Sequence, residues 1–176
     1  MEILIAVCVF LSYWMGSRAI YQGKYHPSIY SRIIWLLFAI NNFASVLLLS
    51  NNSGILTLAG LGLVGNLSIL ILTLRQSEWE FGRTELITTI LLIISLIIWL
   101  LAKLPLLNLT IGLMAHFIGG IPTYKKVIKD PRQEDLFFWF FFFLASALAL
   151  LGINWNYISN YLYPLYFAIF DGLMVV

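Results

Sequence analysis

Long apolar stretches alternate with short polar ones along almost the whole chain. Each stretch is roughly 17–21 residues, about the length that an α-helix needs to cross a hydrocarbon core of ~30 Å. A transmembrane barrel would show alternating segments of about ten residues instead, and the chain has none. The pattern predicts an all-α membrane protein with transmembrane helices at residues 3–20, 33–50, 54–74, 86–102, 104–124, 136–153 and 158–176.

Turn signals separate these predicted helices. Asn51-Asn52-Ser53-Gly54 predicts a tight polar turn between the second and third helices. Pro105 is expected to open the fifth helix, because the first N–H group of a helix needs no partner. The N-terminus has no basic region and no small-residue cleavage site, so residues 3–20 are expected to be a retained helix and not a signal peptide.

Composition agrees with a membrane protein and excludes several functions. The chain is 61% hydrophobic and 10% charged, whereas soluble domains are about half apolar and a quarter charged. A net charge of +2 without a basic tract gives no footprint for nucleic acid. The single cysteine, Cys8, excludes an internal disulfide and a thiolate metal site. No metal or other cofactor is predicted.

The positive charges orient the predicted helices. Nine of the ten Lys and Arg residues fall on or beside three loops of one side, and only Lys103 lies on the other. Because cytoplasmic loops are enriched in Lys and Arg, we predict an external N-terminus and a cytosolic C-terminus. The nine residues are Arg18, Lys24, Arg32, Arg75, Arg83, Lys125, Lys126, Lys129 and Arg132.

A weak internal repeat suggests how the helices are grouped. At an offset of 104 residues, four positions match: Gly16, Pro27, Trp35 and Phe38 with Gly120, Pro131, Trp139 and Phe142. The matched blocks both run from one span through a basic loop into the next. We therefore predict a 3+1+3 arrangement: residues 1–76 and 104–176 form two parallel three-helix bundles, and residues 77–103 carry a linking helix. In such folds the substrate lies between the halves, near the midplane.

This layout, with Ile121-Pro122-Thr123-Tyr124-Lys125-Lys126 followed by Trp139, resembles the SWEET, SemiSWEET and PQ-loop (MtN3-like) transporters. The chain departs from their pattern at Thr123, which stands in place of Gln. The first copy has Arg18-Ala19 where Pro-Gln is expected. SWEETs have four hinge prolines, and Pro122 is the only candidate for one of them in this chain. The resemblance implies alternating access, with Pro122 as a hinge.

The same resemblance implies substrate contacts from the third helix of each bundle, where the family has Asn. Asn66 and Asp171 take these places, and the change to Asp favours a cationic solute or proton coupling over a neutral sugar. Asp171 is the only acidic residue well inside a span, where an ionised carboxylate costs roughly 2.5–3.5 kcal/mol. The other interpretations are a wet helix end for Asp171 and a hydrogen bond between helices for Asn66.

Two further polar positions lie inside the predicted spans. His116 suits a substrate contact or a proton relay because histidine titrates near neutral pH, and a satisfied histidine between helices is an equal alternative. Asn41 and Asn42 point about 100° apart on one helix. The pair is expected to tie helices together or to line a cavity, with Asn42 as the candidate substrate contact.

Aromatic residues allow two interpretations as well. Trp35 and Trp139 are bulky enough to gate a path, although aromatic residues at membrane interfaces often anchor helices. We expect the run 137–143 to contact lipid. Tyr157, Tyr161 and Tyr163 are expected to form an outer aromatic belt.

The sequence thus predicts a transporter for a small polar solute (a sugar, amino acid or organic cation), working by alternating access and proton-coupled through Asp171. The alternative is a membrane receptor or assembly protein that binds without transport. No Ser/His, paired-carboxylate or metal-ligand spacing indicates an enzyme. The lipid bilayer is the expected partner, and the sequence does not decide whether the protein forms a homo-oligomer.

Overall fold

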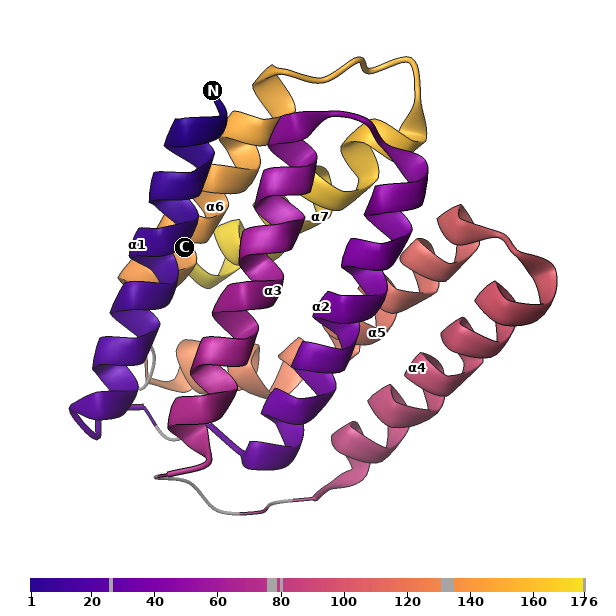
Figure 1. Ribbon diagram of the computed structural model, residues 1–176. Helices are drawn as coiled ribbons and strands as arrows, with labels where there is room; N and C mark the ends of the chain where they lie inside the picture. Colours follow the sequence, from indigo (N-terminus) through magenta and orange to yellow (C-terminus); the bar gives the residue numbers. More distant parts are fainter. Residues whose placement is uncertain (26, 76–78, 80, 131–134, 176) are drawn as a thin grey trace.

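The structure is a computed structural model that describes residues 1–176 except 26, 76–78, 80, 131–134 and 176, and without the side chain of Lys126. The described residues form an all-α bundle (Figure 1). Its helices are α1 (Glu2–Tyr21), α2 (Ile29–Leu49), α3 (Ser53–Thr73), α4 (Arg83–Ala102), α5 (Pro105–Lys129), α6 (Leu136–Leu151) and α7 (Ile158–Val175).

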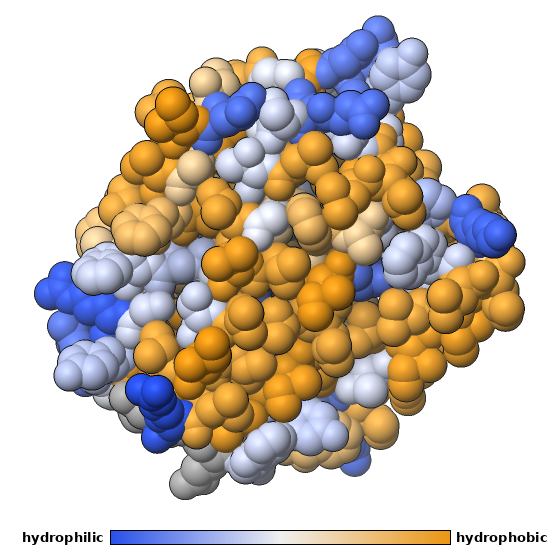
Figure 2. All heavy atoms as spheres, in the orientation of Figure 1, coloured by the Kyte–Doolittle hydropathy of each residue, from blue (hydrophilic) through white to orange (hydrophobic). Residues whose placement is uncertain are grey.

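Five of these helices, α1 to α5, are long and apolar enough to cross a membrane, and α6 is a shorter apolar helix of 16 residues. Apolar side chains cover most of the face seen in Figure 2, with hydrophilic residues gathered near the top and at the left edge. A surface of this kind is stable only in contact with lipid or another apolar partner. The chain is therefore a helical, multi-pass membrane protein.

The beginning of α2 differs from the prediction. The charge of Arg32 suggested a start at 33, but α2 begins at Ile29 and Arg32 lies within it, only 4% exposed. Its guanidinium donates to the Tyr25 hydroxyl and lies 4.9 Å from the centroid of the Trp35 ring. A cation–π contact and a hydrogen bond compensate for the lost hydration, so the charge does not end the helix.

The end of α5 is also later than predicted. The helix passes through Pro122 and continues to Lys129, instead of ending at 124. A proline inside a helix removes one N–H donor and bends the axis. The last turns of α5 lie behind α3 in Figure 1 and run in a different direction from its first turns. The basic residues Lys125 and Lys129 are therefore helical rather than part of a loop.

The packing order places α1 between α3 and α6, and α2 between α3 and α5. Helix α7 packs mainly against α6, with smaller contacts to α5, α2 and α3. Helix α4 lies at the edge against α5. Its buried side chains, Thr88, Leu92 and Ser95, are spaced by three and four residues, so only one stripe of α4 faces the bundle.

The loops at the N-terminal end of the bundle bond to one another. The predicted turn at 51–54 is confirmed: Asn52 caps α3 by accepting from the Ile55 amide at 3.1 Å. Its Nδ2 donates to the Gly152 carbonyl oxygen at 2.9 Å, and Ser50 donates to Asn160 Oδ1 at 3.1 Å. Pro105 opens α5 as expected. These bonds fix the upper ends of α2 and α3 against the α6–α7 connection.

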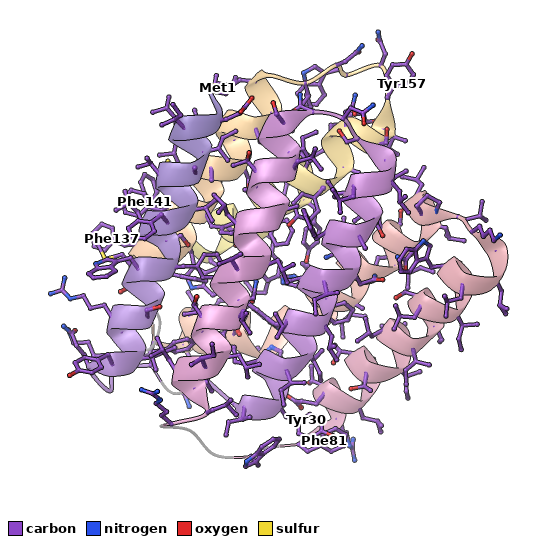
Figure 3. All side chains as sticks on the ribbon, viewed as in Figure 1. Met1, Tyr30, Phe81, Phe137, Phe141 and Tyr157 are labelled. Carbon is purple, nitrogen blue, oxygen red and sulfur yellow. The ribbon has the colours of Figure 1, made fainter. Side chains whose placement is uncertain are left out.

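At the opposite end, Tyr30 and the α3–α4 connection meet. The rings of Tyr30 and Phe81 lie edge to face, with centroids 4.7 Å apart, near the bottom of Figure 3.

The outer side of the bundle carries Phe137, labelled beside α1 in Figure 3 and 61% exposed. We call the end with the α1–α2, α3–α4 and α5–α6 connections the basic end.

Candidate functional site

Six helices enclose a small central cavity of about 30 Å³. The predicted substrate contacts Asn42, Asn66, His116 and Asp171 all line it, and so do Trp35 and Trp139. Pro122 does not line it. The remaining lining residues are Tyr13, Ala39, Gly62, Phe138, Phe142, Tyr163 and Phe167. The sequence therefore predicted residues that the fold brings together from α2, α3, α5, α6 and α7.

Asp171 is buried in the middle of the bundle, with 2% of its surface exposed. Its Oδ2 atom is enclosed and has no hydrogen-bond partner among the described residues. The interpretation of Asp171 as a wet helix end is wrong, because α7 turns this residue inward and four further residues of α7 follow. A buried carboxyl without a partner is costly, and such groups are typical of sites where a ligand, ion or water supplies the missing contact.

The Asn66 amide is held in place by α1. Its Nδ2 donates to the Tyr13 hydroxyl at 2.8 Å and to the Gly62 carbonyl oxygen at 2.9 Å. The Tyr13 hydroxyl in turn donates to the Gly62 carbonyl at 3.0 Å. Both amide hydrogens are therefore used within the protein, and Asn66 is both a tie between helices and part of the cavity wall.

Of the two neighbouring asparagines of α2, Asn41 ties helices together and Asn42 lines the cavity. Asn41 pairs with Asn108 of α5 through both amide groups, at 3.3 and 2.9 Å, and Asn108 Nδ2 also donates to Ser45 Oγ at 2.8 Å. Asn42 faces the cavity, and its buried Oδ1 has no partner in the described residues. Gly112 permits this approach, since a Cβ atom there would lie 2.7 Å from Asn42 Oδ1.

His116 contacts α7 and α2 at once. Its Nδ1 lies 2.8 Å from the Tyr166 hydroxyl, which fixes the ring. The ring centroid lies 4.7 Å from that of Trp35 and 4.9 Å from that of Phe170. His116 is thus a histidine hydrogen-bonded between helices that also lines the cavity, so both interpretations describe part of its surroundings.

An aromatic cluster closes the cavity toward the basic end. The rings of Trp35 and Trp139 lie 6.4 Å apart, and Phe170 lies 6.5 and 6.1 Å from them. The tryptophans are 8% and 2% exposed, so they are not interface anchors. The Trp139 Nε1 donor is buried without a partner among the described residues.

The sequence did not predict most aromatic residues of the site. Phe138 and Phe142 belong to the run expected to contact lipid, but they line the cavity, as does Phe167. Tyr163 was assigned to an outer belt, which is wrong: it is 4% exposed and lines the cavity. Tyr13 supports Asn66, and Phe170 completes the aromatic cluster. Tyr163, Phe167 and Phe170 follow one another at helical spacing with Asp171, and this spacing is the signal that could have shown an inward aromatic face on α7.

The cavity offers a defined chemistry. Among the described residues, two buried oxygen atoms of the cavity lining lack a hydrogen-bond partner (Asn42 Oδ1 and Asp171 Oδ2), and so does one buried donor, Trp139 Nε1. Oxygen acceptors surrounded by aromatic faces suit a cation with N–H or C–H donors. The volume of about 30 Å³ holds about two water molecules.

Comparisons with family models, curated proteins and solved structures found no match to this chain. Among the described residues, no group of three or more His, Cys, Asp and Glu side chains is placed to hold a metal ion. The function is therefore argued from the cavity itself.

Proposed function

We propose that this protein is a membrane transporter that carries a small polar solute through the central cavity by alternating access. One observation carries the proposal: polar side chains from four helices converge on a buried cavity in which three polar groups lack partners. Buried polar groups inside a membrane are expensive and mark solute or ion pathways. In a bundle with a purely structural role, a buried acidic residue such as Asp171 would only reduce stability.

The packing supports the 3+1+3 arrangement as part of this proposal. Helix α3 lies between α1 and α2, and α7 lies against α6 and α5. The main contacts between the two groups are α1 with α6 and α2 with α5. A two-fold axis along the membrane normal would exchange α1 with α5 and α2 with α6, and so would exchange these two contacts. We therefore propose a divergent member of the SWEET and PQ-loop superfamily, with α4 as the linking helix.

Solute access in this proposal requires one of two closures to open. Toward the basic end, Trp35, Trp139 and Phe170 close the cavity. Toward the other end, Asn41 and Asn108 join α2 to α5. Pro122 lies in the bent part of α5, where a missing hydrogen bond makes a hinge less costly. With the basic end cytosolic, the Trp cluster is the inner closure.

The preferred solute is a small organic cation. The one acidic side chain of the cavity lining, Asp171, has a buried oxygen atom with no partner among the described residues, and so has Asn42. The rings of Trp35, Trp139 and Phe142 line the same space and favour a cationic group. Asp171 also provides a place for a coupling proton when no cation is bound.

Flux into proteoliposomes tests the proposal. Purified protein is reconstituted and offered labelled organic cations, amino acids and sugars, with and without a pH gradient. We expect saturable uptake of a cation, lost in Asp171→Ala and reduced in Asn66→Ala. Leu67→Ala is the control, because Leu67 follows Asn66 on α3 but is 46% exposed and lies outside the cavity.

The outcomes separate the candidate functions. A solute that binds with dependence on Asp171 but never crosses would identify a receptor instead of a transporter. Uptake by Asp171→Asn with an unchanged pH dependence would remove proton coupling and leave transport in place. Uptake that is equal in Asp171→Ala and the wild-type protein would refute the central cavity as the path.

A further inference from the structure

A second hollow lies on the outside of the bundle, between α1 and α3. Its volume is about 300 Å³, ten times that of the central cavity. Its rim is apolar and exposed: Phe10, Trp14 and Val64 are 65%, 58% and 58% exposed. Because α1 and α3 both qualify as membrane spans, this groove faces the hydrocarbon of the bilayer and not water.

Gly65, which lines the groove, leaves room for the ring of Tyr13. A Cβ atom at this position would lie 2.1 Å from that ring, so only glycine allows the Tyr13 ring to lie across α3. The space beside Gly65 is therefore occupied by Tyr13.

Tyr13 separates the groove from the central cavity. Its side chain lines both spaces, and its hydroxyl accepts from Asn66 while it donates to the Gly62 carbonyl. One aromatic ring is therefore the wall between lipid and the polar site. A molecule bound in the groove therefore contacts Tyr13, which positions Asn66.

The groove has the length and the charge of a lipid site. Its lining on α1 runs from Val9 to Ser17, about 12 Å along the helix axis, close to the ~15 Å depth of one leaflet's hydrocarbon. Ser17 is the lining residue of α1 nearest the basic end. The exposed Arg18 follows it directly, and the exposed Arg75 follows α3 at the same end. Two guanidinium groups there suit a phosphate.

We propose that the α1–α3 groove binds one acyl chain of a phospholipid from the leaflet at the basic end, with the phosphate near Arg18 and Arg75. The bound chain packs against Tyr13 and holds the wall of the central cavity closed. This site does not depend on the proposed transport, because it is defined by the groove alone.

Photolabelling in nanodiscs tests this assignment. The full-length protein is embedded in phosphatidylcholine with a small fraction of phosphatidylglycerol whose acyl chain carries a mid-chain diazirine. After irradiation, peptide mass spectrometry should find the label concentrated on residues 9–17 and 61–68, saturating near one lipid per chain. Val64→Trp should fill the groove and reduce this labelling about tenfold, which corresponds to 1.4 kcal/mol of binding free energy.

Matched variants make the result decisive. Leu67→Trp adds the same side chain to an exposed position of α3 outside the groove and should leave labelling unchanged. Arg18→Gln should weaken it, because the phosphate loses a charged donor. Label spread evenly over the exposed faces, α4 included, would overturn the site, as would a Val64→Trp protein labelled like the wild type. Unchanged labelling in Arg18→Gln together with Arg75→Gln would overturn the position of the phosphate.

Discussion

Replacing either side chain of the Asn41–Asn108 pair alone should lower the free energy of unfolding much more than replacing both together. Asn108 makes three side-chain hydrogen bonds, two with Asn41 and one with Ser45, between 2.8 and 3.3 Å. Hydrogen bonds between membrane helices average about 0.6 kcal/mol each, so this set contributes about 2 kcal/mol. Asn41→Leu or Asn108→Leu alone also strands a buried amide, at a cost of about 1–3 kcal/mol. The double variant strands none.

A double-mutant cycle measures this coupling. The wild type, both single variants and the double variant are unfolded in micelles with increasing sodium dodecyl sulfate, and helicity is followed by circular dichroism. We expect a coupling energy of at least about 3 kcal/mol, because the two shared bonds count once at about 0.6 kcal/mol each and each single variant strands an amide at about 1–3 kcal/mol. Thr110→Val is the control, since its hydroxyl bonds only to Leu106 of its own helix. A coupling energy within about 0.3 kcal/mol of zero, the ordinary limit of additivity, would refute the tie between α2 and α5.

Two further pairs of substitutions test the packing in the same unfolding assay. Gly65→Ala should destabilise the protein by about 1–3 kcal/mol, because its Cβ would meet the Tyr13 ring at 2.1 Å; Gly152→Ala, with nothing within 4 Å, should stay within about 0.5 kcal/mol of wild type. Ser146→Ala should be nearly neutral, since its buried hydroxyl has no partner in the described part of the chain, whereas Ser45→Ala should cost about 1 kcal/mol because Ser45 bonds to Asn41 and Asn108. Equal costs within either pair would contradict these contacts.

The helices could be predicted from the sequence because apolar runs of membrane length are a strong signal, but two helix ends were misplaced. A charge is costly inside a membrane, so the sequence places Arg32 at the edge of a span. Its compensation comes from Tyr25, which lies seven residues earlier across a loop. Pro122 was taken to lie near the end of its helix, yet α5 continues for seven residues beyond it. Both errors arise from contacts and bends that no local pattern contains.

The polar part of the site was predicted better than its aromatic part. A polar residue such as Asp171 is rare inside a span, so its presence alone indicates a role. Tyr13 and Tyr163 are ordinary residues for a membrane helix, and only the packing shows that they face the cavity. The split between Asn41 and Asn42 was likewise set by geometry, because α5 brings Asn108 to one amide and not to the other.

The two closures of the cavity are similar in strength, which alternating access requires. At the basic end, Trp35, Trp139 and Phe170 form three ring pairs, each worth about 0.5–1.5 kcal/mol. At the other end, the bonds of Asn108 contribute about 2 kcal/mol. Neither closure exceeds the few kcal/mol that leave a minor state populated at 0.1–10%. In the proposed transport cycle, a bound solute that supplies partners to Asn42 and Asp171 therefore shifts the protein toward either opening without breaking its core.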